Sequence, residues 1–183
     1  MTDNLEAIVS FESQVRVANG LSATSLLLPE LLQISRAMPD NVNGLDGNQA
    51  AQLANVFLKG MDICSELLPL AVSYELKMEA LKRQESSKAI LVRSVVAGYK
   101  TAIDRKEYAN NDDIYLAAVK KHIEATMFRT LIEEKKQVFS KAHHLMKNIF
   151  SRDMENSGEV VRVDGDPAPK TWVQKSSSWI VND

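Results

Sequence analysis

The sequence predicts an all-α protein built on a long antiparallel helical hairpin, with shorter helices before it and a tail of short strands after it. Two long stretches repeat apolar residues at three- and four-residue steps, the spacing of an amphipathic helix. Turn-forming residues separate the stretches, and the 183 residues hold only 7 Gly and 5 Pro. We therefore expect an acidic N-terminal helical segment (1–47), a central hairpin domain (48–152) and an acidic tail (153–183).

The N-terminal segment is predicted to hold short helices. Residues 5–28 fit either an amphipathic helix, which we favour, or a strand hairpin that turns at Asn19-Gly20. The stretch "PELLQISRAM" follows as a short helix, with Pro29 in its first turn. Asn48 is the expected cap of the next helix.

The first long helix is expected from about Leu70 to Asp104. Pro69 either begins it or lies within a continuous helix that starts near residue 49. Its apolar stripe should contain Met78, Leu81, Val92, Val95, Val96, Tyr99 and Ile103. The cations Lys82, Arg93 and Lys100 fall on the opposite side at 100° per residue.

A turn at 110–112 should reverse the chain, because Asn and Asp favour turns and helix N-caps. We interpret the pair Asp112-Asp113 as capping rather than catalytic. A second long helix is expected from about Asp113 to Ser151. Its apolar stripe should contain Ile123, Met127, Phe128, Leu131, Val138, Phe139, Ala142, Leu145, Met146 and Ile149.

So broad a stripe exceeds what one partner helix can cover, and apolar surface left in water costs on the order of 25 cal/mol per Å². The N-terminal segment or further copies of the chain must cover the rest. We expect a homo-oligomer in which hairpins pack side by side, as in a coiled coil.

The tail changes composition to Gly, Pro, Ser and Asp, and alternating residues predict one or two short strands, as in a β-hairpin. It carries Trp172 and Trp179. Two large aromatic residues in such a tail are expected either to pack on the hairpin or to dock on a protein partner.

Charge is unevenly distributed along the chain. Residues 1–73 hold three Lys and Arg against eight acids, residues 74–152 hold sixteen against ten, and the tail holds three against six. Within the middle, His122, Arg129, Lys136 and His143 recur every seventh residue, and Lys147 extends this ridge. Rows of cations bind phosphate backbones, whereas a solvated face interleaved with Glu133 and Glu134 is the alternative explanation.

Catalytic and metal motifs are not found in the sequence. It has no nucleophile elbow, no phosphate-binding glycine loop and no zinc-ligand spacing, so we expect neither an enzyme, a cofactor nor a metal. His143 and His144 point about 100° apart on a helix and cannot share one ion. Cys64 is expected to be a buried, inert thiol. The lone cysteine and the absence of a signal or membrane segment favour the cytoplasm, or the host cytoplasm for a viral protein.

The stretches "SYELKMEALKRQ…KNIFSR" and "FLKGMDICSELLPLAVS", together with the acidic head and strand-forming tail, resemble two families of tailed-phage proteins. One is the small terminase subunit, whose hairpins form a DNA-binding ring that regulates the packaging motor. The other is the recombination mediator, a helical ring protein that loads recombinase onto single-stranded DNA. The resemblance covers residues 50–150 and lies in organisation only, so no family residue is carried over.

The sequence thus leads to two hypotheses for a protein without catalytic activity. In the first, it is an oligomeric DNA accessory of phage-type packaging or recombination, with its contacts at Lys82, Arg93, Lys100, Arg129, Lys136, His143 and Lys147. In the second, it is a helical assembly or adaptor protein that binds no nucleic acid. Salt dependence of DNA binding separates the two.

Overall fold

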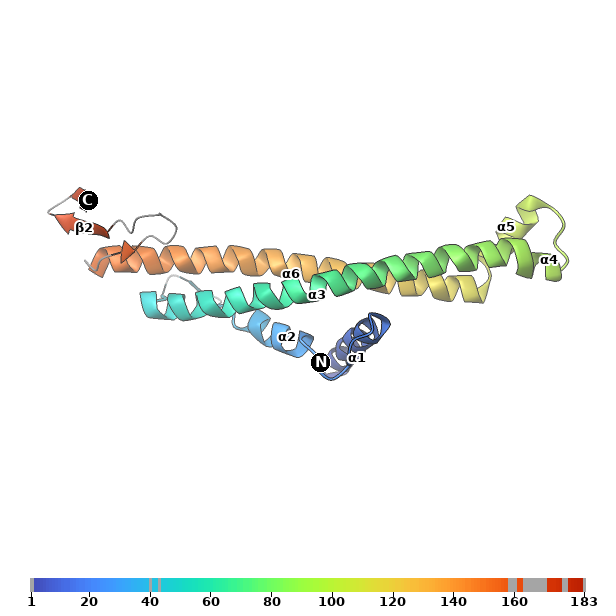
Figure 1. Cartoon of the computed structure of the whole chain (residues 1–183), viewed down its shortest axis with the longest axis horizontal. Coiled ribbons are helices and arrows are strands. Elements are labelled where there is room, and N and C mark those ends of the chain that lie inside the picture. Colours follow the sequence, from blue (N-terminus) through green and yellow to red (C-terminus); the bar gives the residue numbers. More distant parts are fainter. Residues whose placement is uncertain are drawn as a thin grey trace. The chain divides into compact units, whose positions relative to one another are not determined.

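The computed structural model describes residues 2–39, 41–42, 44–157, 161–162, 171–175 and 178–182, with side chains between residues 10 and 155. The helices are α1 (Thr2–Ala18), α2 (Leu28–Arg36), α3 (Gly47–Lys88), a π-helical turn (Ala89–Arg93), α4 (Ser94–Val96), α5 (Ala102–Asn110) and α6 (Asp113–Ser157). The fold class is all-α, and the two longest helices are α3 and α6 (Figure 1).

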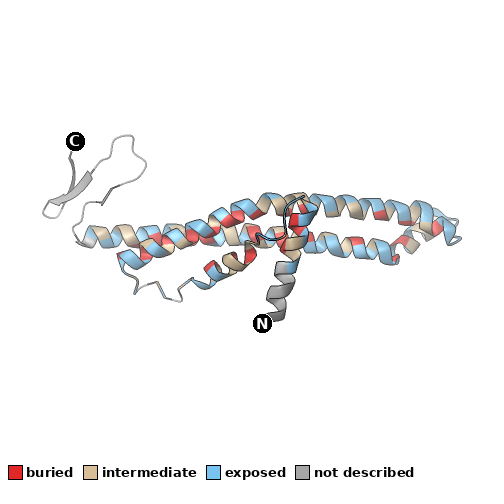
Figure 2. Cartoon of the chain, turned by 60° about the horizontal axis from the view of Figure 1, so that its bottom comes forward, coloured by how far each residue is buried: buried red, intermediate tan, exposed pale blue. Residues whose placement is uncertain are grey.

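The chain divides into two compact units. The first contains residues 1–31 and 63–136, and the second contains residues 32–62 and 137–183. Helices α3 and α6 therefore each contribute a part to both units. Within each unit the two parts lie alongside each other, and buried residues line their facing sides (Figure 2).

In the first unit, a seam of residues at heptad spacing joins α3 and α6. On α3, Cys64 and Ala71 are seven residues apart, and on α6, Ala118, Ala125 and Ile132 repeat the same interval; all five are buried. Across this seam, Glu75 on α3 accepts hydrogen bonds from Thr126 and Arg129 on α6, each at 2.9 Å.

Helix α1 covers part of this seam. The Phe11 ring lies 5.6 Å from that of Tyr74 and 5.2 Å from that of Phe128, measured between centroids. The turn after α1 has Gly20 at φ 76°, a left-handed conformation that glycine adopts without strain. The helix interpretation is thus correct for Thr2–Ala18 and does not extend through the rest of 5–28.

Glu12 ties α1 to the start of α2. Its carboxylate accepts hydrogen bonds from the backbone N–H of Leu27 (2.8 Å) and Leu28 (2.9 Å), and it pairs with Arg16 at 3.1 Å. These N–H groups lie at a helix N-terminus, where no intrahelical acceptor exists. The buried carboxylate therefore caps α2 from another helix.

The second unit has its own aromatic core. The rings of Phe57 on α3 and Phe139 on α6 are stacked with centroids 6.3 Å apart. Gly60 is required there because a Cβ would lie 2.9 Å from the Phe139 ring and 3.0 Å from Ile34. At the start of α3 the cap is Asp46, whose carboxylate accepts from Gln49 N–H at 2.7 Å, and not the expected Asn48.

Three short strands follow α6 in the described residues: β1 (Val161–Arg162), β2 (Thr171–Lys175) and β3 (Ser178–Asn182). They pair antiparallel in the order β1-β2-β3, with Trp172 opposite Val161 and Trp179 opposite Gln174. The side chains of both tryptophans, and hence their expected packing or docking, lie outside the described residues.

The ends of the long helices differ from expectation at two places, the end of the first helix and the end of α6, which extends to Ser157 instead of about Ser151. Pro69 lies inside α3, so the continuous helix is correct, and α6 begins at Asp113 as predicted. The first helix does not continue regularly to Asp104, however. It passes through the π turn, ends after α4 at Gly98 (φ 89°) and resumes as α5.

Candidate functional site

Arg93 is the most deeply engaged of the seven cations predicted to contact DNA. Its guanidinium donates to Asp112 through Nη2 (2.7 Å) and Nε (2.8 Å) and to Glu85 through Nη1 (2.8 Å). Such charge-assisted, two-point hydrogen bonds are among the strongest that a side chain makes. Arg93 therefore clamps the end of α3 to the start of α6 and does not stand on the solvent face.

The clamp changes the protonation of its members. A hydrogen bond from Lys88 and another from Arg93 lower the pKa of Glu85, and Arg93 lowers that of Asp112. The two carboxylates raise the pKa of Arg93. Asp112 also accepts from Tyr115 N–H at 2.8 Å and so caps α6, as the sequence predicts.

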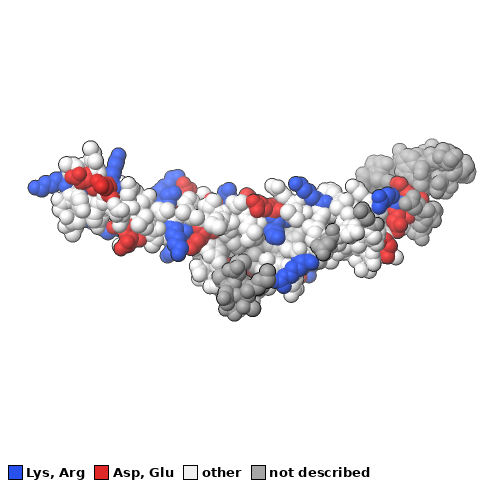
Figure 3. Space-filling model, turned by 180° about the vertical axis from the view of Figure 1, so that it is seen from behind, with Lys and Arg blue, Asp and Glu red and all other residues white. Residues whose placement is uncertain are grey.

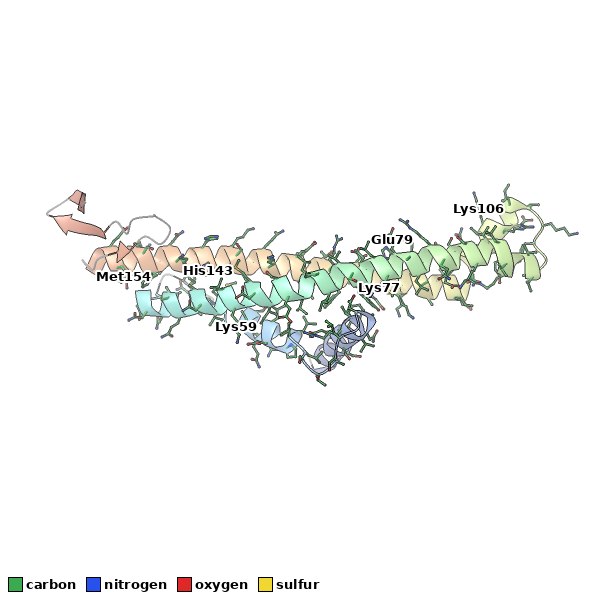
Figure 4. All side chains as sticks on the ribbon, viewed as in Figure 1. Lys59, Lys77, Glu79, Lys106, His143 and Met154 are labelled. Carbon is green, nitrogen blue, oxygen red and sulfur yellow. The ribbon has the colours of Figure 1, made fainter. Side chains whose placement is uncertain are left out.

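Two further candidates make internal contacts. Arg129 lies 2.9 Å from the Glu75 carboxylate and 3.5 Å from that of Glu133. His143 donates through Nδ1 to the Ala54 carbonyl at 2.9 Å, since a carbonyl oxygen can only accept (Figure 4). Both side chains thus link α6 to α3, each within its own unit.

The four remaining candidates are lysines in different settings. Lys82 and Lys136 are half-buried, whereas Lys100 and Lys147 are exposed. The first unit holds five of the seven predicted residues, and His143 and Lys147 belong to the second. On the face drawn in Figure 3, Lys and Arg alternate with Asp and Glu.

The strongest surface feature is one that the periodicity did not predict. We call residues 89–114 the tip. Seven of its large apolar side chains are exposed, and the six that lie between Leu91 and Ile103 form what we call the tip surface: Leu91, Val92, Val95, Val96, Tyr99 and Ile103, with Val96 85% and Ile103 78% exposed; the seventh is Ile114. The expectation that Val92, Val95, Val96, Tyr99 and Ile103 form a buried stripe is therefore wrong.

The π turn explains this inversion. Cys64, Ala71, Met78 and Glu85 succeed one another at seven-residue intervals on the inner side of α3, so Val92 would come next in a regular helix. The Ser94 N–H instead bonds to the Ala89 carbonyl, five residues back, which adds one residue to that turn. Arg93 consequently occupies the inner position, and Val92 faces outward.

The apolar residues after the π turn are exposed because α6 does not extend far enough to cover them. Arg93 is paired with Asp112, and α6 begins at the next residue, so residues 94–110 extend past the start of α6. The signal in the sequence was Glu85: an acid at a seam position needs cationic partners, and both Lys88 and Arg93 pair with it.

A recess of about 680 Å³ opens beside the clamp, lined in part by Tyr99, Glu107, Tyr108 and Ile114. Of its charged lining residues, Arg93 and Asp112 are already paired with each other, which leaves two acids, Glu107 and Asp113. The Tyr99 and Tyr108 rings pack at 5.2 Å between centroids. The recess is thus a feature of the tip.

Cys64 is buried in the seam. Burial raises the pKa of its thiol to about 11, although Lys136 and Lys135 act in the opposite direction. A protonated, enclosed thiol is a poor nucleophile. Among the described residues, His, Cys, Asp and Glu side chains form no group of three that could hold a metal ion.

No helix of the described residues is long and apolar enough to cross a membrane. Comparison of the chain with protein-family models, with curated proteins and with solved structures finds no significant match. The function is therefore argued from the tip and the cations alone.

Proposed function

We propose that this protein acts by binding, as a helical assembly or adaptor protein without catalytic activity. The tip surface is the observation that carries the proposal. A group of neighbouring exposed apolar side chains on a structured turn, here including Leu91 (67%) and Val92 (55%), is typical of a contact site for another molecule.

In this proposal α3 and α6 form a long antiparallel hairpin, in the cytoplasm, that presents the tip to a partner. The strand-forming tail with Trp172 and Trp179 is a second docking element for a protein. Copies of the chain associate into a homo-oligomer.

The engagement of the cations favours an adaptor over a DNA accessory. Arg93, Arg129 and His143 each donate at least one hydrogen bond to another part of the protein. A phosphate would have to compete with carboxylates held at 2.7 to 2.9 Å from the two arginines. Phosphate contacts need cations that are free to replace counterions.

Fluorescence anisotropy with a labelled 30-base duplex and the matching single strand tests this choice. The adaptor proposal predicts no saturable binding at either about 50 or about 200 mM salt. Binding at low salt that weakens steeply at the higher concentration overturns it, because such a slope measures released counterions.

DNA binding as a packaging or recombination accessory is the second candidate. The exposed positions of Lys100 and Lys147 favour it, since both ammonium groups are open to solvent. If it is correct, K100E and K147E each weaken binding and reduce its salt slope by about one. Exchanging the clamped Arg93 would not serve as a test, because that change disrupts the tip.

A further inference from the structure

The tip buries charge and exposes hydrocarbon, the reverse of an ordinary helical surface. Within the tip Ser94 is fully buried and Asp112 is 8% exposed, as is Glu85 four residues before the tip begins, while the tip surface faces solvent. Leu91 and Val95, and likewise Val92 and Val96, are four residues apart and lie on one side of the helix. An apolar face is thus built over an ionic interior.

The tip surface is also held in a fixed conformation. The Thr101 hydroxyl caps α5 by accepting from Asp104 N–H at 3.1 Å, and Arg105 Nε donates to the Tyr99 carbonyl at 3.1 Å. With the Arg93 clamp beneath, these bonds fix both sides of the turn at Gly98. A surface that is already ordered binds a partner without a further loss of conformational entropy.

The charges of the tip indicate which partner fits. Residues 89–114 contain four Lys and Arg and four Asp and Glu, so their formal charges cancel. Lys100, Lys106, Glu107 and Asp113 are exposed near the apolar side chains, and Lys106 lies on α5 at this end of the helices (Figure 4). A strongly charged partner, or an anionic membrane, would call for a rim of one sign.

A rim with both signs suits a surface that meets itself. In a two-fold symmetric interface the same patch serves both sides, so every cation on one copy needs an anion on the other.

We propose that the tip surface docks on the tip surface of a second copy of this chain, forming a two-fold symmetric contact centred on its aliphatic residues. This deepens the proposed adaptor function by naming the partner of that site. The two tips bury their valines against each other, and Lys100 and Lys106 pair with acidic residues of the other copy.

Cysteine crosslinking of the full chain tests the contact. V96C places a thiol at the most exposed of these positions, and the enclosed Cys64, with its thiol pKa of about 11, does not compete for the reagent. A short bis-maleimide should join V96C chains as dimers at least about tenfold faster than E134C chains, whose exposed thiol on α6 is the matched control. Equal rates for the two variants overturn the proposal.

The native mass of V96D, measured by light scattering on a sizing column, gives an independent readout. Two aspartates facing each other in an apolar contact should weaken self-association at least about tenfold. The exposed L76D variant on α3 carries the same charge outside the tip and should retain the wild-type mass. Circular dichroism checks that both variants fold.

The outcomes separate this inference from the adaptor function. A wild-type chain that stays monomeric, with no rapid V96C crosslink and no DNA binding, overturns tip-to-tip docking and leaves the adaptor with another partner. Val96-dependent binding to phosphatidylcholine vesicles by such a monomer assigns the tip to a lipid surface and also overturns the contact. Saturable, salt-dependent DNA binding overturns the adaptor function itself, whatever the crosslinking shows.

Discussion

The seam and the tip of the first unit bury different kinds of residue. In the seam, the large apolar residues Leu67, Phe128 and Ile132 are enclosed. At the tip, the polar Ser94 and Asp112 are enclosed together with the small Ala89 and Ala109, and the tip surface faces solvent. On the side of the first long helix, the seam and the tip follow each other from α3 through the π turn into α4, and the sequence carries the same apolar periodicity through both. The difference teaches that periodicity predicts burial only where a second helix is present and the helical repeat is constant.

The largest difference in the free energy of unfolding should come from replacing a leucine by alanine in the seam and in the tip. Leu67→Ala leaves a cavity in the seam and should lower the free energy of unfolding by about 2–5 kcal/mol. Leu91→Ala removes an exposed side chain at the tip and should change it by less than about 0.5 kcal/mol. Urea unfolding measures the free energy of unfolding of both variants, at a protein concentration low enough that the chains do not associate through their tips. Equal decreases for the two variants would contradict the comparison.

Acid should destabilise the tip through its carboxylates. The folded-state pKa values of Glu85 and Asp112 lie below their ordinary values, so their contribution is complete above about pH 5 and is lost as pH falls through the folded pKa values, below about pH 4. Arg93→Met removes the largest cause of the Asp112 shift and should flatten this decline. Thermal melts between pH 3 and 7 measure it.

The control for the acid experiment is Lys88→Met. It removes a partner of Glu85 only and leaves the Arg93–Asp112 pair in place. Its stability should still decline with acid, less steeply than in the wild type and more steeply than in R93M. Identical profiles for all three proteins would show that the clamp does not couple tip stability to pH.

The smallest effect should come from removing the extra residue of the π turn. Deletion of the exposed Leu91 converts that turn to an ordinary helix and leaves Arg93 and Ser94 on the inner side, so the melting temperature should change little. Deletion of the equally solvent-facing Arg83 instead rotates the following residues by about 100° and should separate Arg93 from Asp112. If deletion of Leu91 lowered the melting temperature more than deletion of Arg83 does, this explanation of the tip would be wrong.

Local chemistry determined much of the architecture from sequence. The all-α class, the start of α6 at Asp113 and the capping role of Asp112 follow from periodicity and from short-range hydrogen bonding, both of which act within a few residues. Buried positions with a buried heptad neighbour, such as Phe139 and Met146, were also predictable. Even the Asp46 cap lay within two residues of the one expected.

Other features were decided by the tertiary structure. That Glu12 caps α2 from another helix depends on residues fifteen and sixteen positions away, and that Arg93 turns inward depends on Asp112. The sequence by itself determined which helices form. Only the tertiary structure decided which faces they bury, because burial depends on where a partner helix ends and on how buried charges find their counter-charges.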